Sequence, residues 1–189
     1  MAALQTGGRR RLSQGELDMF VAGHERFLSG KPGGKRASLR CVDLSGLSLS
    51  GRDLTDADLS GSVFQNCRMI GIRLTGANLF ACDLRKANLQ GALMMRADLR
   101  GARLAGANLT RAELTDAILA PLPIGATRFN AVSLAEAQLR YVSAQGADFS
   151  RAAFDGADLR GGDFTGAIFR GASLDGINRM QAAGLPEAV

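Results

Sequence analysis

Few residues of this chain have the type and spacing that catalysis or metal binding requires. There is one histidine, His24, and no two of the three cysteines, Cys41, Cys67 and Cys82, form the C-x-x-C pair of a zinc or redox site. The sequence contains neither the phosphate-binding motif G-x-x-x-x-G-K-[ST] nor the nucleophile motif G-x-S-x-G. We therefore expect a non-enzymatic protein with no catalytic residue, no bound metal and no cofactor.

The compartment follows from the cysteines and from the start of the chain. Arg9, Arg10 and Arg11 are followed by polar residues and not by the apolar run of an export signal. No stretch of about 18 apolar residues could cross a membrane. An odd number of cysteines without an export signal indicates reduced thiols, so the expected localisation is cytoplasmic, with no membrane insertion.

Aspartates are frequent, but they recur at one place in a five-residue pattern. Every fifth position of residues 39–174 is large and apolar, except Ala144. A small residue commonly stands two places before it, Asp or Asn one place before it and Gly two places after it, as in Ala157, Asp158, Leu159 and Gly161. The regular placing of the carboxylates favours a structural role over acid–base catalysis.

A period of five suits neither a helix nor a strand. Steps of five on an α-helix rotate by about 140°, and odd steps on a strand alternate between its faces. The apolar series can line one interior only if the chain bends once in each repeat, and the recurrent glycine supplies the positive φ that a type II turn needs. With 46% apolar residues but no Trp and one Tyr, the core is expected to be narrow.

This motif closely resembles the pentapeptide-repeat family over residues 39–174. The resemblance implies an all-β solenoid, a right-handed quadrilateral β-helix with four repeats in each coil and about seven coils. The expected organisation is a flexible basic tail at 1–12, a capping helix and linker at 13–38, the β-helix at 39–177 and a C-terminal cap or tail at 178–189. The phase of five is unbroken, so the sequence predicts no insertion.

Two departures from the pattern have structural consequences. Ala144 puts a small residue in a large slot, between stack neighbours that we expect to be Ile124 and Phe164; either phenylalanines lean into the gap or the chain bulges locally. Pro121 and Pro123 cannot donate hydrogen bonds to a ladder, which predicts weaker bonding between coils at their corner.

Both ends of an open β-helix need covering. At the N-terminal end, Ser13 and Glu16 have the spacing of a capping box, and they open an amphipathic helix that Gly30 and Pro32 end. We expect the helix to lie over the first coil through its apolar residues, which are Leu17, Phe20, Val21, His24, Phe27 and Leu28. At the other end, Ile177, Met180 and Leu185 are candidates for a lid or for a homodimer contact.

Assigning the repeats to four sides in steps of twenty residues predicts a polarised surface. The side of Leu54 and Leu114 is expected to be acidic, through Asp53, Asp56, Glu113, Asp116, Glu136, Asp155 and Asp175. The neighbouring side of Leu49 and Leu109 is expected to be basic, through Arg68, Arg111, Arg128, Arg151 and Arg170. These residues either form solvated surface with weak ion pairs or a docking surface. Leu93 and Met95 are candidates for an apolar contact patch.

The leading functional hypothesis is a protein–protein interaction scaffold whose partner is another protein. The alternative comes from the quinolone-resistance relatives, which mimic DNA and bind gyrase; that mimicry needs a strongly acidic rod, whereas this chain carries a net charge of +5. Three consecutive arginines are the only sign of nucleic-acid binding, and no aromatic residues for base stacking lie among them, so a nucleic-acid partner is not expected.

Overall fold

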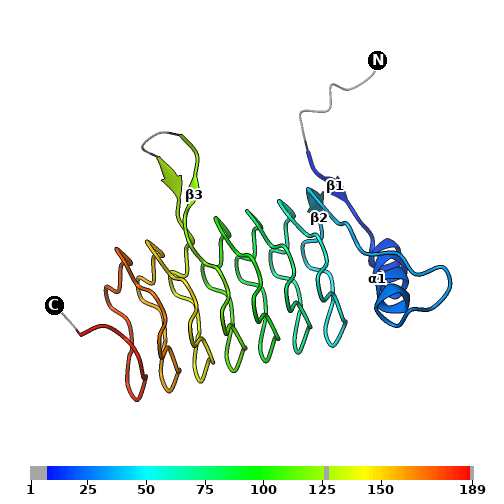
Figure 1. Ribbon diagram of the computed structural model, residues 1–189. Coiled ribbons are helices and arrows are strands. Elements are labelled where there is room, and N and C mark those ends of the chain that lie inside the picture. The colour runs from blue at the N-terminus through cyan, green and yellow to red at the C-terminus, as the bar shows by residue number, and fades with distance from the viewer. Residues whose placement is uncertain (1–7, 126–127, 188–189) are drawn as a thin grey trace.

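The computed structural model describes residues 8–125 and 128–187, which form a rod closed at one end by a helix (Figure 1). Strand β1 (Arg10–Arg11) and helix α1 (Gln14–Leu28) come first, and β2 (Val42–Asp43) lies in the first coil. Strands β3 (Leu122–Pro123) and β4 (Phe129–Asn130) form a hairpin that projects from the rod. The rest of the rod is a stack of coils joined by single parallel bridges.

The coils of the N-terminal half repeat every twenty residues, which is four five-residue units. Parallel bridges join Ser38 to Asp58 and continue at this spacing as far as Asp98 to Ile118. Each bridge carries backbone hydrogen bonds between coils, such as Leu39 N–H to the Asp58 carbonyl at 2.8 Å. The buried amides are therefore paired along the rod axis, and the central residues stack in the interior, where most are fully buried.

Each repeat ends in a tight turn at its predicted place. In one of them, Ala57 N–H donates to the Leu54 carbonyl at 3.1 Å, and the third residue of the turn, Asp56, has φ of 58°. Positive φ at this place defines a type II turn. Glycine occupies many of these positions, but Ala81, Lys86 and others hold the same conformation with a side chain. The predicted bend in each five-residue unit is thus present.

The prediction that no insertion interrupts the repeats is wrong. Arg103 pairs with Ser133, a spacing of thirty residues, before the spacing of twenty resumes at Ser133 and Ala153. The ten additional residues contain the β3–β4 hairpin, in which Leu122 pairs with Asn130. An insertion of two units leaves the phase of five intact, and for that reason the sequence pattern does not reveal it.

The hairpin also accounts for the two prolines. Pro123 lies in β3 and Pro121 directly precedes it. At the corner next to them the bonding between coils is weaker, as predicted. Gly91 N–H donates to the Thr110 carbonyl at 2.9 Å, but among the described residues Gly101 N–H makes no corresponding bond to the Ala120 carbonyl. Ile124 and Phe129, which are in phase with the central residues, are 55% and 42% exposed instead of lining the core.

The slot at Ala144 shows no bulge. Its neighbours in the ladder pair normally, since Ser143 bridges both Glu113 and Asp163, and Ala144 N–H donates to the Asp163 carbonyl at 2.8 Å. The insertion changes its stack neighbour from the predicted Ile124 to Leu114. On the other side, the next coil brings three phenylalanines into contact with one another, with Phe149 lying 5.2 Å from Phe154 and 6.0 Å from Phe164 between ring centroids.

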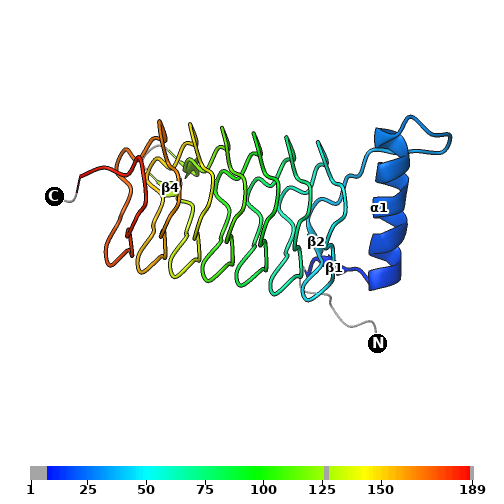
Figure 2. The same ribbon diagram turned by 90° about the horizontal axis from the view of Figure 1, so that it is seen from below.

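Helix α1 lies across the N-terminal end of the rod (Figure 2). Ser13 is its N-cap and exchanges hydrogen bonds with Glu16, and Leu17, Val21 and His24 are buried against the first coil. Three residues predicted to cover the core end, Phe20, Phe27 and Leu28, are instead 42%, 46% and 38% exposed. Phe20 and Phe27 lie toward one flank of the buried stripe, whereas Leu28 is in line with the stripe but is the last residue of the helix.

The chain before the helix extends the ladder by part of a coil. Arg10 and Arg11 pair in parallel with Val42 and Asp43, and Leu12 is buried. Residues 8–12 therefore differ from the flexible tail that the sequence predicts, whereas residues 1–7 lie outside the described residues. At the C-terminal end, Ile177 and Leu185 pack partly on the core, but Met180 is 61% exposed and does not contribute to a lid.

Candidate functional site

The outer surface of the rod has four sides, each named here by its first central residue: the Leu39, Leu44, Leu49 and Leu54 sides. The residues before and after each central residue point outward, and the ladder shows which of them share a side. The hairpin adds ten residues, which is half of a coil, so each residue after it lies two sides further round the rod than a spacing of twenty predicts. Every candidate after residue 130 therefore lies on the side opposite to the predicted one.

The predicted acidic surface is divided between two opposite sides. Asp53, Asp56, Glu113 and Asp116 lie on the Leu54 side, together with Asp163 and with Arg73 and Arg96. The other three predicted members, Glu136, Asp155 and Asp175, lie on the Leu44 side. A continuous acidic side of the predicted composition does not exist among the described residues.

The predicted basic surface is divided in the same way. Arg68 and Arg111 lie on the Leu49 side, whereas Arg151 and Arg170 lie on the Leu39 side. Arg128 belongs to neither, because it lies in the hairpin next to β4. The guanidinium of Arg151 lies 4.4 Å from the ring centre of Phe129, so the base of the hairpin is held against the Leu39 side.

Two arginines that the sequence assignment missed complete the Leu49 side. Arg140 and Arg160 both contact the Asp158 carboxylate, at 2.6 and 2.7 Å, and their hydrogen bonds lower the pKa of Asp158. Farther along this side the guanidinium of Arg111 lies 6.0 Å from the Tyr141 ring. The signal that could have found these arginines is the loss of the small-polar-Leu-x-Gly motif between residues 120 and 131, where two prolines also occur.

The predicted apolar patch is weak. Leu93 and Met95 lie on the Leu54 side but are half-buried. Met95 contributes to a shallow hollow of about 290 Å³ with Thr75, Thr115 and Asp116. The more exposed apolar side chains of the rod are spread over different sides, and they are Ile70, Ile118, Tyr141, Ile168 and Met180.

Many of the carboxylates stabilise the turns of the solenoid. The Asp53 carboxylate accepts hydrogen bonds from the backbone N–H of Thr55 at 3.0 Å and from its hydroxyl at 2.7 Å. Asp163 makes the same pair of bonds with Thr165, and these bonds lower the pKa of Asp163. A carboxylate kept ionised by its own turn is a poor proton donor, which agrees with the structural role predicted for the repeated aspartates.

The cysteines do not form a reactive centre. The thiols of Cys67 and Cys82 donate to the carbonyls of Leu44 and Leu59, and burial raises their pKa values to about 11 and about 12. Cys41 is exposed at a turn. Within residues 8–125 and 128–187, no group of three or more His, Cys, Asp or Glu side chains could hold a metal ion.

The two ring nitrogens of His24 have different partners, which fixes its tautomer. Its Nδ1 accepts a hydrogen bond from Ala37 N–H at 3.0 Å, so Nε2 carries the proton and donates to the Thr55 carbonyl at 2.9 Å. Nearby, the Arg52 guanidinium makes two bonds to Glu25 at 2.9 and 3.0 Å. These contacts join α1 to the first coil through polar groups as well as apolar packing.

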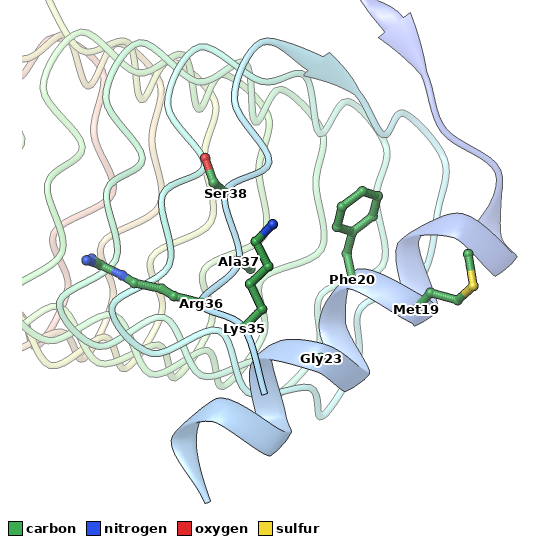
Figure 3. Close-up of a pocket in the computed structure, with 7 residues that line it drawn as sticks. All are labelled: Met19, Phe20, Gly23, Lys35, Arg36, Ala37 and Ser38. Carbon is green, nitrogen blue, oxygen red and sulfur yellow. The ribbon is translucent and has the colours of Figure 1, made fainter. Parts of the chain in front are cut away.

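A hollow of about 330 Å³ opens between α1 and the linker that follows it (Figure 3). Met19, Phe20 and Gly23 line it from the helix, and residues 35–38 line it from the linker. The Phe20 side chain from the helix and the Lys35 side chain from the linker both extend along it (Figure 3). The sequence pattern does not reveal this hollow, because it places Phe20 in the core. The residues that line the hollow include no carboxylate.

Comparison with known proteins agrees with this architecture. Residues 37–76, 77–116 and 133–178 match the family described as pentapeptide repeats, in eight copies, and the unmatched segment 117–132 contains the hairpin. No curated protein matches the chain significantly. Helices long and apolar enough to span a membrane do not occur in the part of the chain described here.

Three solved structures illustrate the similarity. A pentapeptide repeat protein from Nostoc PCC 7120 is 25% identical, with 59% of this chain and 83% of that chain covered and a TM-score of 0.46. A pentapeptide repeat protein from the thylakoid lumen of Arabidopsis thaliana is 30% identical, with 68% of each chain covered and a TM-score of 0.33. A trypsin-treated form of QnrB1, a plasmid-mediated fluoroquinolone resistance protein, is 21% identical over 78% of this chain and 84% of that chain, with a TM-score of 0.26.

Proposed function

Because this chain belongs to the pentapeptide-repeat family, whose fold is a right-handed quadrilateral β-helix, we propose that it is a non-enzymatic scaffold that binds another protein through the surface of its rod. The observation that carries the proposal is the continuous ladder of bridges from Ser38 to Ala183. It fixes the outward side chains on flat sides, so a partner binds a surface that loses little conformational freedom.

The chemistry of the sides supports a protein partner. The Leu49 side presents Arg68, Arg111, Arg140 and Arg160, and the Leu54 side presents acidic residues with Thr75 and Thr115 between them. Such neighbouring surfaces of opposite charge set the orientation of a bound protein and speed its association. The described hollows are shallow, which suits a contact surface better than an enclosed substrate site.

The corrected register further weakens the gyrase-binding alternative. DNA mimicry requires acidic residues that follow one surface, and here Glu136, Asp155 and Asp175 lie opposite to Asp53 and its neighbours. No other observation favours this alternative.

The proposal is tested by capture from an extract of the cells that produce the protein, with the full chain as bait and with chemical crosslinking. We expect one or a few proteins to be enriched saturably by the unchanged chain. Two matched variants assign the side: Arg68→Glu with Arg111→Glu on the Leu49 side, and Glu113→Arg with Asp116→Arg on the Leu54 side. Loss of the captured protein with only one pair supports docking on that side, and absence of any saturable partner contradicts the scaffold function.

A further inference from the structure

Beside α1, apolar side chains of the cap remain uncovered next to the hollow of about 330 Å³. Met19 is 70% exposed and Phe20 is 42% exposed, although the neighbouring Leu17 and Val21 are fully buried. Exposing a phenyl ring and a thioether costs free energy in water, about 25 cal/mol for each Å² of apolar surface. Covering these two side chains would therefore contribute to binding.

Two glycines give the hollow its shape. A Cβ built on Gly34 would lie 2.4 Å from the backbone nitrogen of Phe27, so glycine is what lets the linker touch the helix there. Lys35 N–H then donates to the Gly23 carbonyl at 3.0 Å and holds the next residues beside the helix. A Cβ on Gly23 would meet nothing within 4 Å, so the missing side chain at Gly23 leaves the floor of the hollow open.

Two cations, Lys35 and Arg36, line the hollow, and carboxylates near α1 are already bound by other arginines. Glu16 pairs with Arg10 at 2.6 Å, and Asp18 and Glu25 both pair with Arg52. In the adjoining coil, Asp58 lies 3.4 Å from Arg40.

The two cations of the rim have no such partner. No carboxylate lies within 4 Å of Lys35 or Arg36 among residues 8–125 and 128–187. Arg36 instead donates to the Asp56 backbone carbonyl, which holds its guanidinium in place and leaves its charge uncompensated. An apolar hollow with a fixed cationic rim fits an apolar group that has negative charges beside it.

We propose that this hollow seats one apolar side chain of an acidic segment of the partner protein, with carboxylates of that segment against Lys35 and Arg36. This rests on the proposed scaffold function and names the anchor of the interface. The volume of about 330 Å³ is at the lower limit of small-ligand pockets, about 300–1,000 Å³, so it accepts a single leucine or phenylalanine side chain. A buried apolar anchor surrounded by charges is the usual centre of a specific protein interface.

The test uses two synthetic twelve-residue peptides with one central phenylalanine, flanked by glutamates in one and by lysines in the other. Binding to the full chain is followed through the methyl signals of the methionines in NMR spectra. We expect the glutamate peptide to shift the Met19 methyl signal, to leave the Met180 signal unchanged and to bind at least tenfold more tightly than the lysine peptide. Lys35→Glu should reverse the preference between the peptides.

Gly23→Leu places a side chain in the hollow, where its Cβ would meet no atom within 4 Å, and should weaken binding of the glutamate peptide at least tenfold. Ala22→Leu, on the other flank of α1, should not change this binding. Equal affinity for the two peptides, or an affinity that Gly23→Leu does not change, overturns the proposal. So does binding of phosphatidylglycerol vesicles, but not of the peptide, that is lost in Gly23→Leu, because the hollow would then bind a membrane surface.

Capture from the cell extract separates this proposal from the scaffold function on which it rests. A partner that the unchanged chain and the Gly23→Leu variant capture equally overturns the anchor and leaves the scaffold function standing. Failure of the unchanged chain to capture any partner contradicts the scaffold function itself.

Discussion

Arg103 forms parallel bridges with Asp83, twenty residues before it, and with Ser133, thirty residues after it. The difference of ten residues is the β3–β4 hairpin, which leaves the ladder and returns to it without changing the phase of the repeats. Each side takes up five residues of a coil, so ten additional residues advance the chain by two of the four sides. Every later residue therefore lies on the side opposite to the one that a constant spacing of twenty predicts. This one relationship decides which charges of the surface lie together.

The register predicts unequal costs for two phenylalanine truncations. Phe129 is 42% exposed in the hairpin, whereas Phe149 is fully buried in the next coil. Phe149→Ala should lower the free energy of unfolding by about 3–5 kcal/mol through lost burial and a cavity. Phe129→Ala should lower it by less than about 1 kcal/mol, because Phe129 lies partly exposed outside the core, against Arg151. Urea denaturation measures both losses. Equal losses would indicate that Phe129 lies in the core and that the spacing of twenty continues without an insertion.

The hairpin itself should be removable. Deleting residues 121–130 joins Ala120 to Ala131 and restores a spacing of twenty between Arg103 and the residue that is now Ser133. Ala131 then occupies the turn position of positive φ, so the deletion is made together with Ala131→Gly. We expect a folded rod with cooperative unfolding and a midpoint close to that of the full chain. A shorter deletion, of 121–128, breaks the phase of five, and retention of the native fold by that variant would contradict the register.

The small core residue at Ala144 compensates for the phenylalanines of the next coil. Ala144 is fully buried, and the interior beside it holds the contacting rings of Phe149, Phe154 and Phe164. Ala144→Leu should therefore overfill the core and destabilise the protein by about 1–3 kcal/mol. Adding Phe164→Leu should recover part of that loss, which a double-mutant cycle measures as a favourable coupling. Additive effects of the two substitutions would show that the side chains do not compete for space.

The sequence is sufficient to predict the solenoid because the determinants of the turn and of the core both repeat in every unit. A buried leucine such as Leu54 and a residue of positive φ two places later are local features, so each repeat predicts its own shape. Which residues share a side depends on the whole chain between them and not on one repeat. An insertion of five or ten residues changes the sides but leaves the five-residue pattern intact. The signs of it in the sequence are the prolines at 121 and 123 and the loss of the repeat motif around them.

The candidate site was harder to predict for a related reason. The amphipathic spacing of α1 predicts a helix with an apolar stripe. It does not predict how many residues of that stripe the end of the rod buries. Phe20 lies beyond that width, and the linker approaches the helix only because residue 34 is glycine. The hollow arises where these two elements meet, and neither segment predicts it alone.

Residues of positive φ offer a test of the turns that changes almost no packing. Ala81 has φ of 53° and Gly91 has φ of 64°, and each is the third residue of its turn. Ala81→Gly should stabilise the protein by up to about 1 kcal/mol, because glycine adopts this conformation without the steric cost of a Cβ. Gly91→Ala should destabilise it by about 1 kcal/mol, although a Cβ there would meet no atom within 4 Å. Chemical denaturation of both variants checks the sign, and the same sign for both would contradict the turn assignment.

The exposed and the buried cysteines should differ in their reactivity toward alkylating reagents, and the buried thiols should make stability depend on pH. Burial raises the pKa of Cys67 to about 11 and of Cys82 to about 12, whereas Cys41 is exposed. A pKa that is higher in the folded state means that the stability from these thiols is complete below about pH 8.5 and is lost as the pH rises toward 11 and 12. At pH 8, iodoacetamide should label Cys41 alone in the native protein, and all three cysteines after denaturation in urea. Mass spectrometry of the labelled peptides identifies the sites, and native labelling of Cys82 would contradict its burial.

His24 should determine whether the helix stays on the end of the rod. It is fully buried and forms hydrogen bonds with Ala37 N–H and with the Thr55 carbonyl. His24→Phe keeps an aromatic ring but leaves both backbone groups buried without partners, at about 1–3 kcal/mol for each. Hydrogen exchange should therefore quicken in residues 14–28 and 37–39 of this variant, while the coils beyond residue 60 keep their protection, because each coil is held mainly by its neighbours. Arg26→Ala, at an exposed position on the same helix, is the control and should change little. Equal loss of protection along the whole rod would show that His24 acts through global stability and not through the cap.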